Sequence, residues 1–346
     1  MACLPDRGRS VVALSGAAPL RVVNGLASND TGEVENGRGT YSYLLDRRGR
    51  VVVDLRVLPA PEFEASPGPL TVWLDAPASG REALTRHLEK YVPPILAMHR
   101  PTSAGVVSLL GPLAADALRR WTADSKAVFL KDPGELESLE ATTVRLEGAA
   151  GLAVRREDIE GPGFDLYVEP KDGGGAEAAA IRKQLEAVVT SLDGTVATGA
   201  DWEILRVERG LPAFGAELGP DRLAPEAGQD ARAISLTKGC FTGQEVVARI
   251  HYRGHVNWHL RGIRGGAGTP GDTGDRCDLV GSELHAVAGP PARKPVGVVT
   301  SAVVSPRFGL IGLAYLRREI EPGDTVRSFQ APHGEFEVTA LPFTKR

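Results

Sequence analysis

Residues 238–245 read Lys-Gly-Cys-Phe-Thr-Gly-Gln-Glu, and they carry more chemical information than any other stretch of the chain. Gly239 and Gly243 flank the cysteine, so the backbone can turn tightly there and approach a ligand closely. Thr242 and Glu245 have the spacing of a capping box. We therefore expect a helix to begin at this point of the chain.

Cys240 would then lie just before a helix N-terminus, with Lys238 two residues away. Both a helix N-terminus and a nearby ammonium stabilise a thiolate and lower the pKa of a cysteine. We therefore predict that Cys240 is partly exposed and reactive, and that Cys240 and Lys238 have catalytic roles. Taken alone, the residues leave one alternative open: Cys240 is a small buried apolar residue, as free cysteines often are.

The composition is that of a globular protein with two or three domains. The chain has 346 residues, of which 42% are hydrophobic and 24% charged, and its formal net charge is -4. This acidic balance argues against direct nucleic-acid binding. The three cysteines form no Cys-x-x-Cys pair, so neither a disulfide framework nor a zinc site is indicated, and a cytoplasmic location is expected. No apolar run approaches the roughly 18 residues of a membrane span, so no membrane contact is expected.

Strand and helix patterns alternate over most of the chain. Residues 50–58 are rich in β-formers and predict a strand, residues 79–91 predict a helix, and Pro112 suits the first turn of a second helix. Residues 164–168 alternate in polarity as a strand does. From about residue 254 onward, short β-rich runs alternate with Gly, Pro and Asp turns, which is typical of a small β-barrel or sandwich.

The octapeptide, together with the Val-Val-Ala-Arg and Arg-Gly-His-Val-Asn runs after it, resembles the signature of YgfZ-type proteins, a branch of the aminomethyltransferase superfamily. That signature reads lysine, glycine, cysteine, an aromatic residue, a small or β-branched residue, glycine, glutamine and glutamate. All eight positions are filled here. Further segments with the same resemblance extend over most of the chain: residues 24–34, 44–57, 109–118, 161–168, 208–228 and 294–316.

The resemblance implies an α+β fold: an aminomethyltransferase-like folate-binding body of two interleaved subdomains over residues 1–253, and a C-terminal β-barrel over residues 254–346. It implies a folate-binding accessory protein that supports iron–sulfur cluster assembly or repair, and through it radical iron–sulfur enzymes such as tRNA-modifying ones. The implied cofactor is tetrahydrofolate or another reduced folate. The implied partners are the folate and transiently bound iron–sulfur client or assembly proteins.

The resemblance also implies a folate site. Trp202 stands where the family has a tryptophan implicated in folate binding, and an indole can stack on a pterin ring. Asp165 matches a glutamate that contacts the pterin edge, and Arg249 would meet the folate glutamate tail or an anionic partner. A core tryptophan, a solvated strand residue and a solvated basic face are the respective alternatives. The other residues assigned to cofactor binding are Phe241, Gly239, Gly243, Gln244 and Glu245.

Three further residues are open to more than one interpretation. Glu82 falls near the catalytic aspartate of aminomethyltransferases, but a capping box with Ser79 explains it equally well. Asn29 and Asp30 resemble the family's Thr-Asn-Asp turn, with serine in place of threonine, and we expect them to cap a turn rather than contact a ligand.

Metal binding is not predicted. Three histidines are spaced four residues apart, at 251, 255 and 259, but Gly254 interrupts any helix that would bring them together. Three widely spaced cysteines also argue against a stable iron–sulfur cluster within this chain, because such clusters usually take four cysteine ligands.

Whether the protein is an enzyme stays open in the sequence. The first rival is a folate-dependent aminomethyl- or methyltransferase. Cys240 discriminates against it, because the resemblance implies that glycine-cleavage enzymes lack a cysteine in this segment. The second rival is an interaction module built on the C-terminal barrel.

Overall fold

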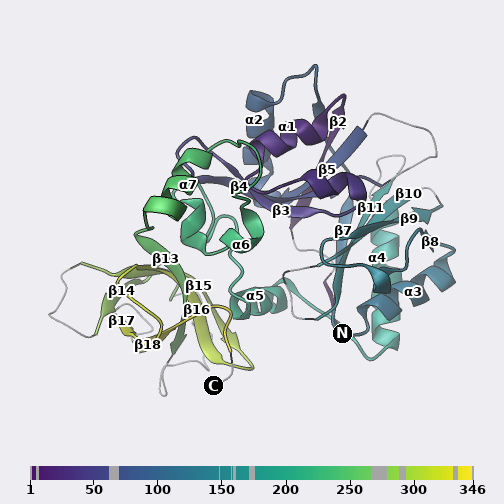
Figure 1. Cartoon of the computed structure of the whole chain (residues 1–346). Coiled ribbons are helices and arrows are strands. Elements are labelled where there is room, and N and C mark those ends of the chain that lie inside the picture. The colour runs from purple at the N-terminus through teal and green to yellow at the C-terminus, as the bar shows by residue number, and fades with distance from the viewer. Residues whose placement is uncertain are drawn as a thin grey trace. The chain divides into compact units, whose positions relative to one another are not determined.

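Figure 1 shows the computed structural model, which describes residues 2–4, 8–61, 70–147, 149–156, 158, 161–170, 176–265, 279–287, 294–329 and 334–344. The internal contacts divide the chain into two compact units. The first comprises Met1–Arg47, Val52–Gly199 and Ala231–Gln244, and the second comprises Arg48–Val51, Ala200–Asp230 and Glu245–Arg346. Residues 200–230 and 245–253, expected in the body, thus cluster with the barrel, and the boundary after residue 253 stays a prediction.

The larger sheet of the first unit has seven strands in the order β12-β1-β7-β11-β10-β9-β8. Their bounds are Ala2–Leu4 (β1), Gly105–Leu110 (β7), Val128–Phe129 (β8), Ala141–Leu146 (β9), Ala149–Arg155 (β10), Gly163–Pro170 (β11) and Thr195–Val196 (β12). Helices α3 (Ala114–Ser125) and α4 (Ala176–Ser191) cover one face of this sheet (Figure 1). Phe164, Leu166 and Val168 of β11 pack there against Trp121 and Leu185 of the two helices.

The smaller sheet has five strands in the order β3-β4-β5-β2-β6. Their bounds are Arg9–Gly16 (β2), Thr40–Leu45 (β3), Val51–Pro59 (β4), Leu70–Pro77 (β5) and Met98–Pro101 (β6). Helices α1 (Pro19–Leu26) and α2 (Arg81–Tyr91) contact β5. Because β1 lies in the larger sheet and the next five strands form the smaller one, the chain passes from one sheet to the other and back, which is the interleaving that the resemblance implies.

The two sheets of the first unit share an apolar core. Val11 of β2 and Trp73 of β5 pack against Leu152 of β10 and Tyr167 of β11. Trp73 and Tyr167 meet edge to face with ring centres 5.9 Å apart. Successive β11 side chains therefore serve different cores, the odd-numbered ones facing the smaller sheet and the even-numbered ones facing the helices, as their alternation predicts.

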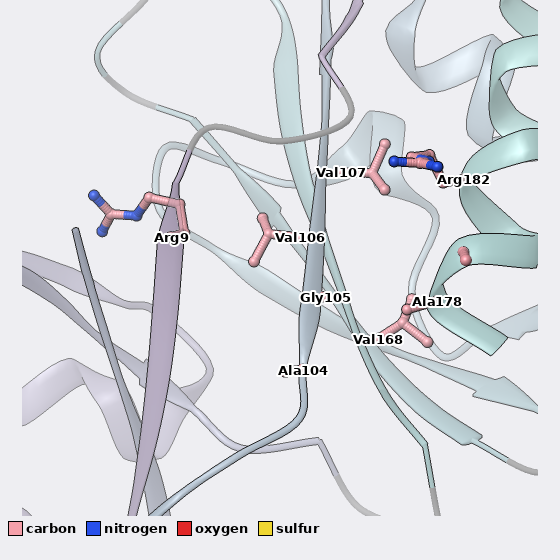
Figure 2. A pocket seen from close by; sticks show the side chains of 9 residues that line it. Arg9, Ala104, Gly105, Val106, Val107, Val168, Ala178 and Arg182 are labelled. Carbon is pink, nitrogen blue, oxygen red and sulfur yellow. The ribbon is translucent and has the colours of Figure 1, made fainter. Parts of the chain in front are cut away.

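A cavity of about 290 Å³ lies beside β7, β11 and α4 (Figure 2). Its walls are mostly small or apolar, with Val106, Val107 and Val168 among them. Two arginines line it, but Arg9 donates to Asp75, and Arg182 approaches Glu186 at 3.7 Å. The lining therefore points to no particular ligand chemistry.

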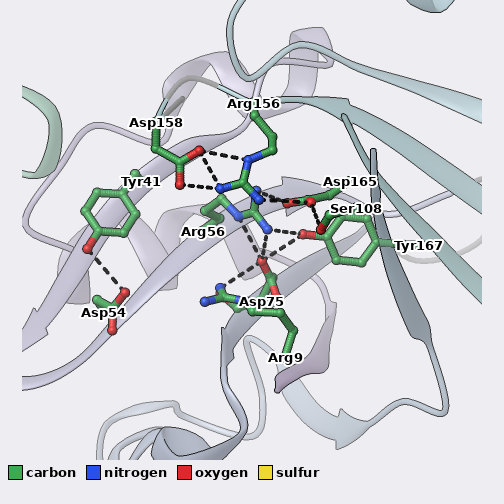
Figure 3. Close-up of polar contacts among 10 residues, drawn as sticks. All are labelled: Arg9, Tyr41, Asp54, Arg56, Asp75, Ser108, Arg156, Asp158, Asp165 and Tyr167. Atoms are coloured by element: carbon green, nitrogen blue, oxygen red, sulfur yellow. Dashed lines mark hydrogen bonds and ion pairs between the residues drawn. The ribbon is translucent and has the colours of Figure 1, made fainter. Parts of the chain in front are cut away.

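A group of buried charged side chains joins the two sheets (Figure 3). Asp75 of β5 accepts from Arg9 Nε at 2.9 Å and from Arg56 Nε at 2.8 Å, and the Tyr167 hydroxyl donates to it at 2.7 Å. Burial alone would raise the pKa of the Asp75 carboxyl, but the Arg9 and Arg56 guanidiniums outweigh burial and hold that pKa below its usual value. Asp75 is thus a buried carboxylate that its arginines keep charged.

Arg56 extends the same group to the larger sheet. Arg56 Nη1 lies 2.7 Å from Asp165 Oδ2, and the Ser108 hydroxyl donates to Asp165 Oδ1 at 2.5 Å. Arg156 lies 3.2 Å from Asp165 and also pairs with Asp158. Three arginines and three aspartates therefore balance one another, which is the condition under which charges can be buried. We call these six residues the ion cluster: Arg9, Arg56, Arg156, Asp75, Asp158 and Asp165.

The second unit contains a closed barrel of six strands in the order β13-β16-β15-β14-β17-β18. Their bounds are Trp258–Gly265 (β13), Glu283–Ala286 (β14), Gly297–Ser305 (β15), Gly309–Arg317 (β16), Thr325–Ser328 (β17) and Gly334–Thr339 (β18). The predicted barrel is confirmed. Helix α5 (Gly199–Glu208) packs Val207 against Leu260 and Tyr315 of the barrel. Helices α6 (Asp230–Ala233) and α7 (Gln244–Arg253) lie between α5 and the first barrel strand in the chain.

Several local predictions were wrong at the helix starts. A short 3-10 turn precedes α2, Ser79 makes no capping bond, and Glu82 pairs with Arg86 on the exposed surface instead. Helix α3 begins at Ala114, two residues after Pro112. A capping pattern in the sequence has several possible local structures, and packing selects among them.

Replacing Arg56 by methionine should unfold the protein more easily. The substitution leaves Asp75 and Asp165 buried without their shared guanidinium, so we expect a loss of about 3–5 kcal/mol. Arg86→Met is the matched control, because the Arg86–Glu82 pair is exposed and should be worth less than about 1 kcal/mol. Urea unfolding at pH 7 measures both, and equal midpoints for the two variants would contradict a structural role for the ion cluster.

Candidate functional site

The segment between α6 and α7, residues 234–243, is called the cysteine loop. Within it Lys238 is 9% exposed and Phe241 is 6% exposed, whereas Gly239 and Cys240 lie at the surface. The alternative of a buried core cysteine is therefore wrong. Cys3, by contrast, is buried, and burial raises the pKa of its thiol to about 12. Cys277 lies outside the described residues.

Helix α7 begins at Gln244, one residue later than a capping box of Thr242 and Glu245 predicts. Gly243 adopts φ +84°, a left-handed conformation that glycine tolerates and other residues resist. This turn ends the cysteine loop and directs the chain into the helix. Gly239 has no such φ, and a β-carbon added to it would meet no heavy atom within 4 Å, so the two glycines play different parts.

Lys238 is turned away from solvent. Its Nζ donates to three backbone carbonyls, those of Asn24 at 2.6 Å, Ala27 at 2.8 Å and Asn29 at 2.8 Å. Burial lowers the pKa of this ammonium to about 8. All three N–H groups are thus engaged, and none is left to donate to the Cys240 sulfur. The catalytic role predicted for Lys238 stays a prediction, and its contacts favour a structural one.

Further hydrogen bonds join the turn that receives Lys238 to helix α6, which directly precedes the cysteine loop. Ser28 Oγ donates to the Ala233 carbonyl at 2.6 Å, and Asn29 Nδ2 donates to the carbonyls of Arg232 and Tyr41 at 2.8 and 3.0 Å. Asp30 accepts from the backbone of the same turn. The predicted turn-capping role of Asn29 and Asp30 is confirmed, and the Asn29 side chain also joins α6 to β3.

A buried tyrosine–aspartate pair lies at the other end of these contacts. The Tyr41 hydroxyl donates to Asp54 Oδ2 at 3.2 Å, and the Arg232 guanidinium lies 4.1 Å from the centre of the Tyr41 ring. Burial raises the pKa of the Asp54 carboxyl, although Arg9 and the Tyr41 hydroxyl partly oppose this. Asp54 Oδ1 is buried and accepts no hydrogen bond from the described residues. A buried carboxyl that has a raised pKa and one oxygen without a partner is typical of a functional site.

Tyr41, Asp54 and Arg232 were not singled out from the sequence. One signal was present: Asp54 and Arg56 interrupt the apolar run of β4 at alternate positions, so both face the same side of the strand. Their hydrophobic neighbours made this strand resemble ordinary core. Glu82, considered instead as a catalytic carboxylate, is exposed and paired with Arg86.

The remaining predicted residues fall into two groups. Asp165 is completely buried, and Arg56, Arg156 and Ser108 engage both of its oxygens, so the solvated alternative is wrong and contact with a pterin is disfavoured. Trp202 is half-buried on α5 in the second unit. On α7, Glu245 and Arg249 are exposed and Gln244 is half-buried, and their ligand roles stay predictions.

The fold and the site define a two-sheet α+β protein with a C-terminal barrel and an exposed cysteine linked to a buried carboxyl. The sequence matches the GCVT N-terminal domain family over residues 10–238, more than half of the chain, and the chain belongs to this family. The crystal structure of the glycine cleavage system aminomethyltransferase T from Bartonella henselae shares the fold, with a TM-score of 0.76 and 20% identity over 99% of this chain and 86% of that one.

Three curated relatives extend the comparison. A protein of Phaeosphaeria nodorum, named iron-sulfur cluster assembly factor IBA57 homolog, mitochondrial, is 27% identical over 75% of this chain, which spans 55% of that relative's length. An aminomethyltransferase of Moorella thermoacetica is 28% identical over 97% of this chain and 84% of its own. The tRNA-modifying protein YgfZ of Klebsiella pneumoniae is 29% identical over 41% of each chain.

The described residues contain neither a membrane-spanning helix nor a metal-binding cluster. No helix there combines the length and the apolar character needed to cross a membrane. Nor do any three His, Cys, Asp or Glu side chains in the same ranges gather as they would around a metal ion. Helix α7 ends at Arg253, so His255 and His259 follow it rather than share its face.

Gly243→Ala should destabilise the protein while Gly239→Ala should not. A left-handed conformation costs an alanine about 1–2 kcal/mol, whereas an open position outside that region should change stability by less than about 0.5 kcal/mol. Urea unfolding of the two variants provides the comparison. A tolerated Gly243→Ala would show that the turn into α7 does not need glycine.

Asp54→Asn and Asp75→Asn should shift stability in opposite directions at pH 7. The raised pKa of Asp54 means that its ionised form is disfavoured in the folded state, so the neutral amide should raise the urea midpoint. This gain should shrink as the pH falls through the Asp54 pKa, because the wild-type carboxyl then protonates. Asp75 has a lowered pKa and stabilises the fold at pH values above its unfolded pKa, so its amide should lower the midpoint. A loss of stability in Asp54→Asn would contradict the assignment.

Proposed function

We propose that this protein is a folate-binding accessory factor that supports iron–sulfur cluster assembly or repair. The observation that carries the proposal is the exposed Cys240, linked through Lys238 and Asn29 to the buried Tyr41–Asp54 pair. A surface thiol is accessible to another protein, and a buried carboxyl with an unpaired oxygen is suited to a small ligand with N–H donors. The two features together match an accessory factor that holds a cofactor and meets a client.

The names of the relatives support the iron–sulfur part of the proposal. One relative is named an iron-sulfur cluster assembly factor, and another is named a tRNA-modifying protein. The clients would be iron–sulfur assembly proteins or radical iron–sulfur enzymes such as tRNA-modifying ones, bound transiently. We place the protein in the cytoplasm, in keeping with three cysteines that form no closely spaced pair.

The residues of the first unit fit a reduced folate. The aminopyrimidinone edge of a pterin presents paired N–H donors, and Asp54 Oδ1 is a buried acceptor without a partner among the described residues. The Tyr41 hydroxyl donates to this carboxyl, and the Arg232 guanidinium lies over the Tyr41 ring. A bound folate supplies one-carbon chemistry. The folate-binding roles of Trp202 and Arg249 stay predictions from the family resemblance.

A folate-dependent aminomethyltransferase is the second candidate. The Moorella thermoacetica relative of that name, matched over nearly the whole of this chain, favours it. Cys240 argues against it, because an exposed thiol is not needed to transfer an aminomethyl group to folate. We therefore expect no glycine-cleavage activity.

Folate binding and the role of the thiol can be separated with three proteins: wild type, Asp54→Asn and Cys240→Ser. Titration with tetrahydrofolate under anaerobic conditions should quench tryptophan fluorescence in the wild type and in Cys240→Ser. In Asp54→Asn the Kd should rise about tenfold or more, because an amide replaces the ionisable acceptor of the pterin N–H groups.

In cells that depend on the protein, Cys240→Ser should lower the activity of iron–sulfur enzymes while its melting temperature stays unchanged. The Cys240 thiol should also alkylate faster than Cys3, which is buried and has a raised pKa. A wild-type protein that binds no reduced folate would refute the folate part. Full client activity with Cys240→Ser would refute the role of the thiol.

A further inference from the structure

The exposed Gly239–Cys240 pair is flanked by two buried side chains. Lys238 precedes it and Phe241 follows it, and the Lys238 ammonium lies 5.5 Å from the centre of the Phe241 ring. A cation at that distance from an aromatic face is attracted to it. The first four residues of the octapeptide are therefore buried, exposed, exposed and buried in turn, and the two buried side chains lie on the inner side of the loop.

Two of the three carbonyls that receive Lys238 lie at the C-terminal end of α1, and the third, that of Asn29, lies in the turn that follows. Asn24 is in the last turn of the helix, and Ala27 is its C-terminal cap. Carbonyls at this end of a helix have no intrahelical donor and carry the negative end of the helix dipole, so they favour a cation. No basic residue stands in the last turn of α1. The cation comes instead from Lys238, 214 positions further along the chain.

We propose that Lys238 is a positioning residue: a tethered ammonium ion that occupies a cation site of three carbonyls and thereby fixes the cysteine loop with Cys240 outward. The proposal deepens the function given above and rests on it for the use of the thiol. It assigns the lysine of the octapeptide no proton transfer and no bond to sulfur. A tetrahedral ammonium with three donors matches three converging carbonyls, whereas methionine has no donor and the planar guanidinium of arginine has a different geometry.

The charge balance around the site is compatible with this role. Burial alone disfavours the ammonium, and Asp30 is the carboxylate that partly offsets burial. With its pKa lowered to about 8, the amine is still mostly protonated at pH 7. The three carbonyls therefore bind the charged form of Lys238 at pH 7.

A nitroxide label on Cys240 tests whether the loop is held. Labelling uses a Cys277→Ser background, and Cys3 is buried. The label should give a restricted spectrum in the wild type and a mobile one in Lys238→Met, and amide hydrogen exchange of the loop should accelerate about tenfold or more. Lys183→Met is the matched control, because Lys183 is exposed on α4 and its loss should change neither measurement.

Chemical rescue separates a bound cation from simple packing. Lys238→Ala removes a fragment equivalent to propylammonium, so n-propylammonium should restore the restricted spectrum, whereas n-propanol at the same concentration should not. An unchanged loop in both Lys238 variants, or equal rescue by the alcohol, would overturn the proposal.

A wild-type measurement covers the case in which the variants do not fold. One lysine ammonium of the nitrogen-15-labelled protein should exchange its protons slowly enough to be observed by NMR at neutral pH, as three carbonyl partners require. Failure to observe any such ammonium would also overturn the proposal. None of these measurements involves folate or a client, so the positioning role and the proposed function can fail independently.

Discussion

The Arg56 guanidinium lies between Asp75 of the smaller sheet and Asp165 of the larger one, and the first unit is built around this contact. Apolar side chains of similar size would give such an interface comparable or greater stability. The buried ion pair therefore matters because it selects one arrangement of the strands. A one-residue shift of β4 would turn Arg56 away from both aspartates and leave them buried without it. The ion cluster therefore ties the register of β4 to both sheets.

That register also determines where Asp54 lies. Asp54 and Arg56 are two positions apart on one strand and so share its face toward the larger sheet. The contact that secures Arg56 consequently carries Asp54 into the interior, where the Tyr41 hydroxyl meets it. Asn29 bonds the Tyr41 carbonyl and the Arg232 carbonyl, and its own carbonyl receives Lys238. Three distant segments of the chain thus converge on one asparagine, which is why the exposed thiol and the buried carboxyl belong to one arrangement.

The sequence predicted the parts of this arrangement that local pattern controls. The barrel, the strand alternation of β11 and the exposed cysteine followed from periodicity, turn residues and the octapeptide. The interleaving of the sheets came from family resemblance alone. The partners of Lys238 could not be predicted, because they are backbone carbonyls 209 to 214 positions away, and a carbonyl carries no sequence signal. Asp165 was misjudged for a related reason: a carboxylate on a strand is equally compatible with solvent, ligand or a buried arginine, and only the fold selects the arginine.

The buried ionisable groups of the first unit divide into two kinds. In the ion cluster the partners compensate burial, so the pKa of Asp75 is lowered and its charge is secure. At Asp54 and Lys238 burial prevails, which raises the pKa of the carboxyl and lowers that of the amine, so each is displaced toward its neutral form. A buried group whose charged form is disfavoured lowers the stability of the fold, so its presence calls for a structural or functional reason. For Lys238 that reason lies within the chain, because its ammonium donates to three backbone carbonyls at and just after the end of α1. Asp54 Oδ1 has no such partner among the described residues, and the folate proposed above would supply one.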